Sequence, residues 1–355
     1  MRMRWLWPML LLVTTVGLAG ERVVFPPVPR DAPVSLPRDH GAHPAYGLEW
    51  WYVTGWLETK GGPVGFQITF FRRRMSFDDG NPSRFAPRQL ILAHAALADP
   101  AKGRLDHAQR LAREGFGLAE AATGDTNVSI DDWQLVRQGD GRFATHFGGA
   151  DFTLDLMLTP TQPPLLQGDR GYSRKGPGEG EASAYFSMPH LSAEGRLKRG
   201  NDVETVKGTA WLDREWSSSL LNPRSQGWDW AGLNMDDGSA VTVFRVRDAD
   251  GHPMWAGGSV RAADGSLVIL RPEDVNFETR RLWRSPRSGA RYPVETTIEI
   301  ATPSGKKRYL VQPLMDDQEL DIVREGGPVY WEGAVRVPGG RGYLELVGYG
   351  DRVRL

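Results

Sequence analysis

The chain has 355 residues, which is enough for two domains of ordinary size, each with its own core. It contains 13 Trp but no Cys, so disulfide bonds, thiolate metal sites and cysteine nucleophiles are excluded. The 43 basic and 44 acidic residues give a net charge of −1 without a basic stripe, which argues against nucleic acid as a partner. The seven His are scattered along the chain, and we predict neither a metal site nor a cofactor.

The first twenty residues have the pattern of a secretory signal peptide. Arg2 and Arg4 form a basic start, a mostly apolar run continues to Leu18, and small residues follow. This apolar run is too short for a stable membrane span. We therefore expect an exported, periplasmic protein whose signal is cleaved near residue 19–20. An uncleaved anchor is the alternative.

Residues 21–35 are rich in proline, which opposes helices and central strands, so we expect an extended lead-in. After it, apolar and polar residues alternate with a period of two in residues 64–70, 152–159 and 294–300. The apolar run from Arg88 to Ala98 also suits a buried strand. Strands at this spacing, separated by Gly, Asp and Pro turns, predict an all-β barrel or sandwich.

A tryptophan-rich pattern occurs twice. Trp51 and Gly55 have the same spacing as Trp228 and Gly232, and the two copies are offset by 177 residues. Each copy is followed by a turn and by a Phe-Arg pair, at residues 71–72 and 244–245. The repeat favours two related all-β domains, which we place at residues 36–220 and 222–355 because Asn222-Pro223-Arg224-Ser225 has the composition of a linker.

Three other features of the first domain stand out. Glu49 lies among tryptophans and is interpreted as a buried partner for an arginine such as Arg72. His94 is alone in an apolar strand, where a hydrogen-bonded core histidine is the first interpretation and a ligand contact the alternative. The segment from Gln167 to Gly180 is rich in Gly and charge and is predicted to be a mobile loop.

The most unusual polar cluster spans residues 211–216, Trp-Leu-Asp-Arg-Glu-Trp. On a strand, Trp211, Asp213 and Glu215 point to one face and the other three residues to the opposite face. Two acids beside an indole in a barrel interior are costly unless they are paired or protonated. A desolvated carboxyl group has a raised pKa and can act as a general acid. Pairing of both acids with arginine or backbone at the domain junction is the alternative.

Several of these segments together carry a resemblance to a known family. They are residues 49–55, 67–72, 211–217, 227–230, 330–333 and 342–346. With them the sequence resembles the carotenoid 1,2-hydratase/AttH-like family over about residues 40–350. The resemblance implies two lipocalin-like antiparallel β-barrel domains packed together, with a cleft between or within them. Asp213 matches the position of the proton donor proposed for the hydratase branch.

Two functions follow from the resemblance. The first is binding of an apolar small molecule or lipid, at the membrane periphery and beside an ABC-type transport system. The second is a hydro-lyase that adds water to an isolated alkene, with Asp213 as the acid and aromatic faces stabilising the cation. A hydrolase using Asp213 and Glu215 is a further alternative. The predicted ligand contacts are Trp51, Gln67, His94, Tyr185, Trp211, Trp228 and Trp230.

Overall fold

The computed structural model describes residues 23–31, 34–75, 83, 85–178, 180–219, 221–321 and 329–350. The predicted signal peptide lies outside these residues. Helix is limited, in the part of the chain described, to two short 3-10 turns, η1 (Arg38–His40) and η2 (Pro272–Asp274), and none of it could span a membrane. Nearly all other regular structure is antiparallel strand, which confirms the predicted all-β fold.

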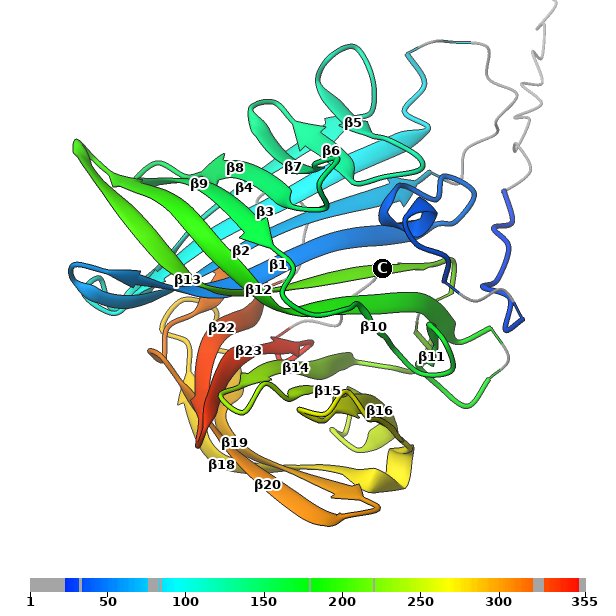
Figure 1. Cartoon of the computed structure of the whole chain (residues 1–355). Coiled ribbons are helices and arrows are strands. Elements are labelled where there is room, and N and C mark those ends of the chain that lie inside the picture. The colour runs from blue at the N-terminus through cyan, green and yellow to red at the C-terminus, as the bar shows by residue number, and fades with distance from the viewer. Residues whose placement is uncertain are drawn as a thin grey trace, which may run out of the picture.

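The first sheet is formed by the N-terminal part of the chain and curls into a nearly closed barrel (Figure 1). Its strand order is β4-β3-β2-β1-β13-β12-β9-β8-β7-β6-β5, with β10 and β11 paired to β12. β3 also contacts β6 and β8 across the interior. The strands are β1 (Leu48–Thr59), β2 (Gly62–Arg74), β3 (Gln89–Asp99), β4 (Arg104–Arg113), β5 (Ala119–Ala121), β6 (Asn127–Ile130), β7 (Trp133–Arg137), β8 (Phe143–Gly148), β9 (Phe152–Thr159), β10 (Leu165–Leu166), β11 (Tyr172–Arg174), β12 (Ala182–Arg199) and β13 (Asp202–Ser217).

The second sheet follows in the C-terminal part of the chain. Its order is β17-β16-β15-β14-β23-β22-β20-β19-β18, with β21 paired to β22. The strands are β14 (Gly227–Met235), β15 (Ala240–Arg247), β16 (Pro253–Arg261), β17 (Leu267–Leu270), β18 (Val275–Arg284), β19 (Arg291–Thr302), β20 (Gly305–Pro313), β21 (Glu319–Asp321), β22 (Val329–Val337) and β23 (Gly340–Val347).

The two sheets repeat one pattern around a central strand. β1 lies between β2 and β13, and β14 lies between β15 and β23 in the same way. Glu49 of β1 is opposite Arg72 of β2, and Asp229 of β14 is opposite Arg245 of β15. The structural repeat therefore aligns Glu49 with Asp229.

This alignment corrects the register that the sequence suggested, which paired Trp51 with Trp228. Trp51 is fully buried in the core of the first barrel, whereas Trp228 faces the other sheet. Because side chains alternate across a strand, a shift by an odd number of residues moves every side chain to the opposite face. The repeat was visible in the sequence, but its offset is 180 residues (Glu49 to Asp229) and not the 177 that the tryptophans suggested.

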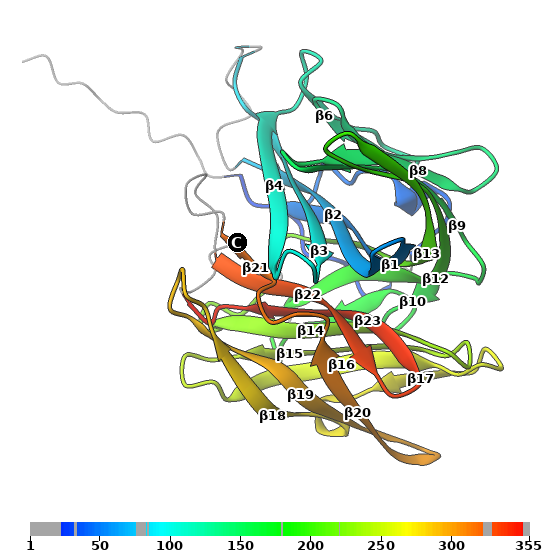
Figure 2. The same cartoon turned by 90° about the vertical axis from the view of Figure 1, so that its left-hand side faces the viewer.

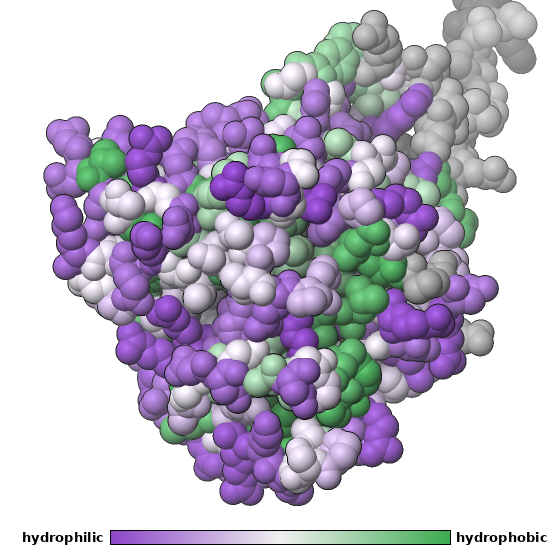
Figure 3. Space-filling view, viewed as in Figure 1, coloured by the Kyte–Doolittle hydropathy of each residue, from purple (hydrophilic) through white to green (hydrophobic). Residues whose placement is uncertain are grey.

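The two sheets pack face to face (Figure 2). A second layer of aromatic side chains fills the space between them. This layer includes Tyr52, Trp56, Trp211 and Trp230, which lie on the face of each strand opposite to its own barrel core. Hydrogen bonds also cross the interface, such as the one that Trp56 Nε1 donates to the Gly342 carbonyl at 3.0 Å. Figure 3 shows apolar surface gathered along the seam between the two halves.

Candidate active site

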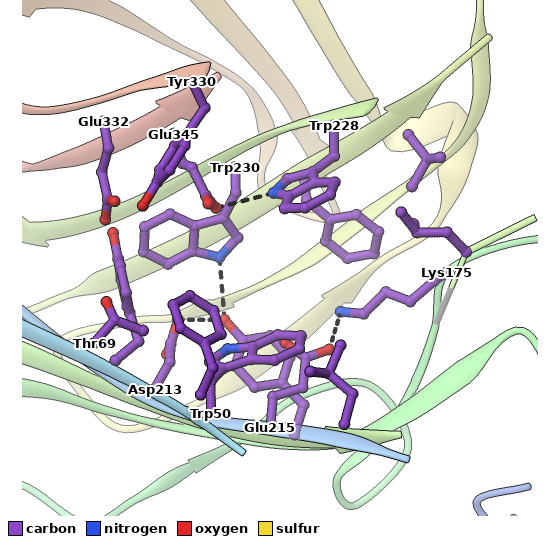
Figure 4. Close-up of a pocket in the computed structure, with 17 residues that line it drawn as sticks. Trp50, Thr69, Lys175, Asp213, Glu215, Trp228, Trp230, Tyr330, Glu332 and Glu345 are labelled. Carbon is purple, nitrogen blue, oxygen red and sulfur yellow. Dashed lines mark hydrogen bonds and ion pairs between the residues drawn. The ribbon is translucent and has the colours of Figure 1, made fainter. Parts of the chain in front are cut away.

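A cavity of about 100 Å³ lies between the two sheets, and both contribute walls to it. Its lining is mostly apolar and aromatic, but it also holds four carboxyl groups and one ammonium group (Figure 4). The residues come from the central strands β1, β13, β14 and β23, from their neighbours β2, β12, β15 and β22, and from two connecting segments. They are Leu48, Trp50, Tyr52, Thr69, Phe71, Lys175, Tyr185, Asp213, Glu215, Leu221, Trp228, Trp230, Phe244, Val246, Tyr330, Glu332 and Glu345.

Asp213 is held by three hydrogen-bond donors. The Tyr185 hydroxyl donates to Oδ2 at 2.7 Å, while the Ser187 hydroxyl and Trp211 Nε1 donate to Oδ1 at 2.5 Å and 2.7 Å. Trp230 Nε1 in turn donates to the Tyr185 oxygen at 3.1 Å, which orients that hydroxyl toward Asp213. The carboxyl group is thus fixed in one orientation by side chains from both sheets.

Burial dominates the charge state of Asp213. Removal of the carboxyl group from water raises its pKa to about 7, although the three donors act in the opposite direction. Unlike the acids in the barrel cores, it has no cation among its hydrogen-bond or ion-pair partners in the described residues. A large share of the molecules therefore carries a neutral Asp213 at neutral pH, and the carboxylate that forms on proton loss finds its hydrogen bonds already in place.

Glu215, two residues further along β13, has a different environment. Its carboxylate lies 3.0 Å from the Lys175 ammonium and accepts a hydrogen bond from Ser183. The same ammonium lies over the rings of Tyr185 and Phe244, at 4.6 Å and 4.3 Å from their centroids. The ion-pair alternative is therefore correct for Glu215, with Lys175 in place of arginine, but Asp213 has no such partner.

Two further carboxyl groups occupy the opposite wall. Glu332 of β22 and Glu345 of β23 are direct cross-strand neighbours. Trp228 Nε1 donates to Glu345 at 2.9 Å, whereas Glu332 Oε1 is buried without a hydrogen-bond partner. Burial raises the pKa of Glu345 to about 7 and that of Glu332 well above its ordinary value. The negative charge of Glu345 raises the pKa of Glu332 further, and the charges of Glu215, Asp213 and Asp229 raise that of Glu345. Because like charges so close together resist joint ionisation, this pair retains a proton at neutral pH.

The predicted site residues divide into two groups. Asp213, Glu215, Tyr185, Trp228 and Trp230 line the cavity. Trp211 lies behind Asp213 and supports it through its hydrogen bond. The expected faces of the 211–216 strand are confirmed, since Leu212 and Trp216 belong to the barrel core.

Besides Trp211, three predicted ligand contacts lie outside the cavity lining. Trp51 is on the opposite face of β1, where the Arg214 guanidinium lies 3.7 Å from its ring centroid. Gln67 is buried beside the cavity wall and donates to the Thr69 hydroxyl at 2.8 Å. His94 hydrogen-bonds to the Tyr330 hydroxyl at 2.8 Å, and burial lowers its pKa to about 3, as expected for a neutral core histidine.

The sequence interpretation missed Lys175, Glu332 and Glu345 as site residues. Glu332 and Glu345 belong to segments that carried the family resemblance, but no chemical role was given to them. Lys175 was placed in a mobile loop, whereas the structure pairs β10 and β11 with β12 and buries Lys175. A single lysine in a Gly-rich segment gave no signal of this burial.

Candidate metal ligands are few. In the described residues, Asp248, Asp250 and His252 offer ligand atoms within 4.8 Å of one another. They lie on a turn where Asp248 Oδ1 already accepts the backbone N–H groups of Asp250 and His252. This group lies outside the cavity lining.

Comparison with known proteins places the chain in a family. Residues 27–349 match the AttH-like family. A crystal structure of an AttH-type protein from Nitrosomonas europaea shares 50% identity, with 93% of this chain and 100% of that chain covered and a TM-score of 0.85. The chain belongs to the AttH-like family.

More distant solved structures share the fold of this AttH-like protein. Kievitone hydratase from Nectria haematococca is 16% identical over 93% of this chain and 97% of its own, with a TM-score of 0.64. CghA is 14% identical over 94% of this chain and 98% of its own, with a TM-score of 0.55. Among curated proteins, none matches the sequence.

Proposed function

We propose that this AttH-like protein is a hydro-lyase that adds water to an isolated alkene of an apolar small molecule. The observation that carries the proposal is the buried Asp213, a carboxyl group with a pKa of about 7 in an apolar aromatic cavity. General acids work best when their pKa lies near the operating pH.

The first step is proton transfer from the Asp213 carboxyl to one alkene carbon, which leaves a carbocation on the other carbon and a carboxylate on Asp213. Tyr185, Ser187 and Trp211 donate to that carboxylate, so their hydrogen bonds strengthen as the charge develops. The indole and phenol faces around the cavity stabilise the cation through their π systems. Such contacts are stronger in the transition state than with the neutral alkene.

The second step is attack by water on the cation. Glu332 and Glu345 face Asp213 from the other wall (Figure 4), and the ionised member of this pair accepts the proton that the water loses. The products are an alcohol, an Asp213 carboxylate and a glutamate pair that has gained one proton. The starting state returns when the glutamate pair releases that proton to solvent and Asp213 takes one up. The reverse sequence is a dehydration.

The fold comparison supports this proposal over the other two. A hydratase, kievitone hydratase, shares the fold across nearly the whole chain. Binding without turnover, beside an ABC-type transport system at the membrane periphery, is the competing proposal and rests on the apolar lining of the cavity. The hydrolase alternative is weaker, because Glu215 is engaged by Lys175 and cannot act as a free nucleophile or base.

A labelled-water assay tests the proposal. The protein is incubated with a panel of apolar compounds that carry isolated alkenes, in water enriched in oxygen-18, and products are analysed by mass spectrometry. A product that has gained one labelled water, and that is absent with Asp213→Asn, supports the hydro-lyase. Retained binding with no product from any compound favours the transport proposal.

A further inference from the structure

The catalytic cavity is too small for the whole of a typical apolar ligand. Its volume is about 100 Å³, below the roughly 150 Å³ of a cavity that holds benzene. Sites for drug-sized ligands occupy roughly 300–1,000 Å³. A substrate that places its alkene at Asp213 must therefore extend beyond this cavity.

A larger groove adjoins the cavity. It has a volume of about 370 Å³ and lies between the β11 segment and the strands β15, β16 and β17. Phe244 lines both spaces, so its ring forms the partition between them. Arg174 and Lys175 are adjacent in the sequence but line different spaces: Arg174 lines the groove and Lys175 lines the cavity. We call this space the Trp255 groove, defined by Phe244, Trp255, Ala256, Gly257, Ile269 and Leu270.

Glycine keeps the partition thin. Gly257 of β16 is the cross-strand neighbour of Phe244, and a Cβ at this position would lie 3.3 Å from Phe244 Cζ. Gly258 follows with a φ of +155°, and a Cβ there would clash with the Thr242 carbonyl. Two adjacent glycines weaken a strand interior, and they mark places where a ligand or another chain segment approaches the backbone closely.

The groove is suited to an apolar chain and not to an anionic group. Three arginines line it, but each has partners already. Arg271 pairs with Asp274 at 3.1 Å, Arg30 lies 3.9 Å from Asp169, and Arg174 donates to the carbonyls of Gly176 and Pro177. Arg174 also lies over the Trp255 ring, 4.4 Å from its centroid.

One of the apolar side chains that line the groove is exposed to solvent. Ile269 of β17 has 41% of its surface exposed, although it lines the groove. Leu267, two residues earlier on the same strand, is 46% exposed but lies outside the groove. The two side chains lie on the same face of β17, but only Ile269 lines the groove, so Leu267 can serve as a matched control.

We propose that the Trp255 groove binds the chain of an elongated apolar substrate whose reacting end lies at Asp213. The chain passes the Phe244 ring, which shifts to connect the two spaces. This proposal rests on the proposed function for the reaction at one end of the substrate. It adds a separate claim about the length of the substrate and the path that its chain takes through the protein.

A chain-length series tests the length. The probes are 1-alkanols of about six to about sixteen carbons, which resemble a hydration product, and their affinities are measured by calorimetry. Each buried methylene should strengthen binding about fourfold, and the gain should continue through the longer members. If only the catalytic cavity bound them, the gain would end within the shortest members, and the proposal would be overturned.

Two variants test the path. Ile269→Glu places a carboxylate in the groove and should weaken binding of the longest alkanols at least about tenfold while leaving the shortest unchanged. Leu267→Glu adds the same charge on the same strand but outside the groove. This variant should bind both the longest and the shortest alkanols as the wild-type protein does. Equal losses in both variants, or no loss in either, would contradict the assigned path.

Failure of this inference can be told apart from failure of the proposed function. Asp213→Asn should abolish hydration yet leave the chain-length series intact, since the groove lies on the other side of Phe244. Hydration of short alkenes with no length dependence would reject the groove alone. A full length dependence without turnover of any alkene would reject the hydro-lyase alone.

Discussion

At the scale of single residues, Asp213 and Glu215 have contrasting environments, and the proposed chemistry depends on this contrast. Both acids lie on the same face of β13, both are buried, and they are two residues apart. Lys175 lies 3.0 Å from Glu215, whereas Asp213 receives only neutral donors. One carboxyl group is therefore paired with a cation, whereas the other has only neutral hydrogen-bond donors around it.

Substitution of Asp213 by Asn should abolish turnover with little change in stability. Asn keeps the shape of a neutral carboxyl group but has no acidic proton, so we expect the free energy of unfolding to change by at most about 1 kcal/mol. Glu215→Gln is the matched comparison, because it strands the buried Lys175 charge and should cost about 3 kcal/mol or more. Thermal melts measure the stability of both variants, and an activity assay measures their turnover. A large loss of stability in Asp213→Asn would show a structural ion pair instead.

The rate of hydration should have a maximum near neutral pH. Asp213 must be protonated to act, and its pKa is about 7, so kcat/KM should fall roughly tenfold per unit at higher pH. The glutamate pair must hold one negative charge to accept a proton, so the rate should also fall on the acid side. Asp213→Glu, which keeps an acid, should shift the alkaline limb, whereas a rate that stays constant from neutral to alkaline pH would exclude Asp213 as the acid.

At the scale of strands, each central strand carries a buried acid that holds two arginines. Glu49 binds Arg72 and Arg214, and Asp229 binds Arg245 and Arg247. The prediction that Glu49 is a buried partner of Arg72 is confirmed. These acids face the barrel cores, and the aromatic residues beside them face the cavity.

This arrangement explains what the sequence could and could not predict. Alternation and turn residues predicted the strands, and the short spacing of the 211–216 cluster predicted its two faces. The pocket depends on pairings between distant strands, such as Glu332 beside Glu345 or Lys175 near Glu215. No local pattern encodes these contacts. The offset of the repeat was misread because tryptophan occurs on both faces of β1 but on one face of β14, whereas the acid–arginine pair occurs on the same face in both.

Loss of either central acid should destabilise the fold strongly. Glu49→Gln leaves two buried guanidinium groups without their carboxylate, and we expect a loss of about 3–5 kcal/mol in the free energy of unfolding. Asp229→Asn should act similarly in the second sheet. Glu58→Gln is the control on the same strand, since Glu58 pairs with Arg341 at the surface and should contribute at most about 1 kcal/mol. Denaturant titration measures all three. Equal small effects would mean that the buried pairs add little.

At the scale of the whole molecule, the candidate site exists only where the two sheets meet. Asp213 and Tyr185 come from the first sheet, and Trp230, Glu332 and Glu345 come from the second. Neither half alone contains the acid and the opposing carboxyl pair. The duplicated architecture thus supplies a shared, buried interface in which carboxyl groups can be kept partly neutral.

The location of the protein is a separate prediction. Residues 1–20 have the pattern of a cleaved export signal, so the mature chain should begin at Gly20 or Glu21 and be found in the periplasm. N-terminal sequencing of protein isolated from the envelope measures this directly. Met1 retained in a membrane fraction would identify the segment as an anchor.

The carboxyl groups of the interface and of the barrel core should give the folded protein a stability maximum at mildly acidic pH. Burial raises the pKa of Asp213 and Glu345 to about 7, so between pH about 4 and 7 the folded state binds more protons than the unfolded chain. These carboxyl groups therefore make the free energy of unfolding decrease as the pH rises through this range. The buried His40 and His94, whose pKa values burial lowers to about 4 and about 3, oppose this decrease up to the ordinary histidine pKa of 6.5. For Glu49, burial alone would raise the pKa, but Arg214, His43 and Arg72 outweigh it and lower the pKa below its ordinary value of 4.5. Its contribution is complete above that value and is lost as the pH falls below it.

These opposite slopes should place the maximum near pH 4 to 5, about the range of ordinary carboxyl pKa values. Denaturant unfolding at a series of pH values measures the position. Asp213→Asn combined with Glu332→Gln removes two of the groups that favour protonation, so this double variant should flatten the decline between pH about 4 and 7 and leave the acid side unchanged. A double variant with the same pH dependence as the wild-type protein between pH about 4 and 7 would show that the interface carboxyl groups are ionised in the folded state. That result would remove the physical basis for Asp213 as a proton donor.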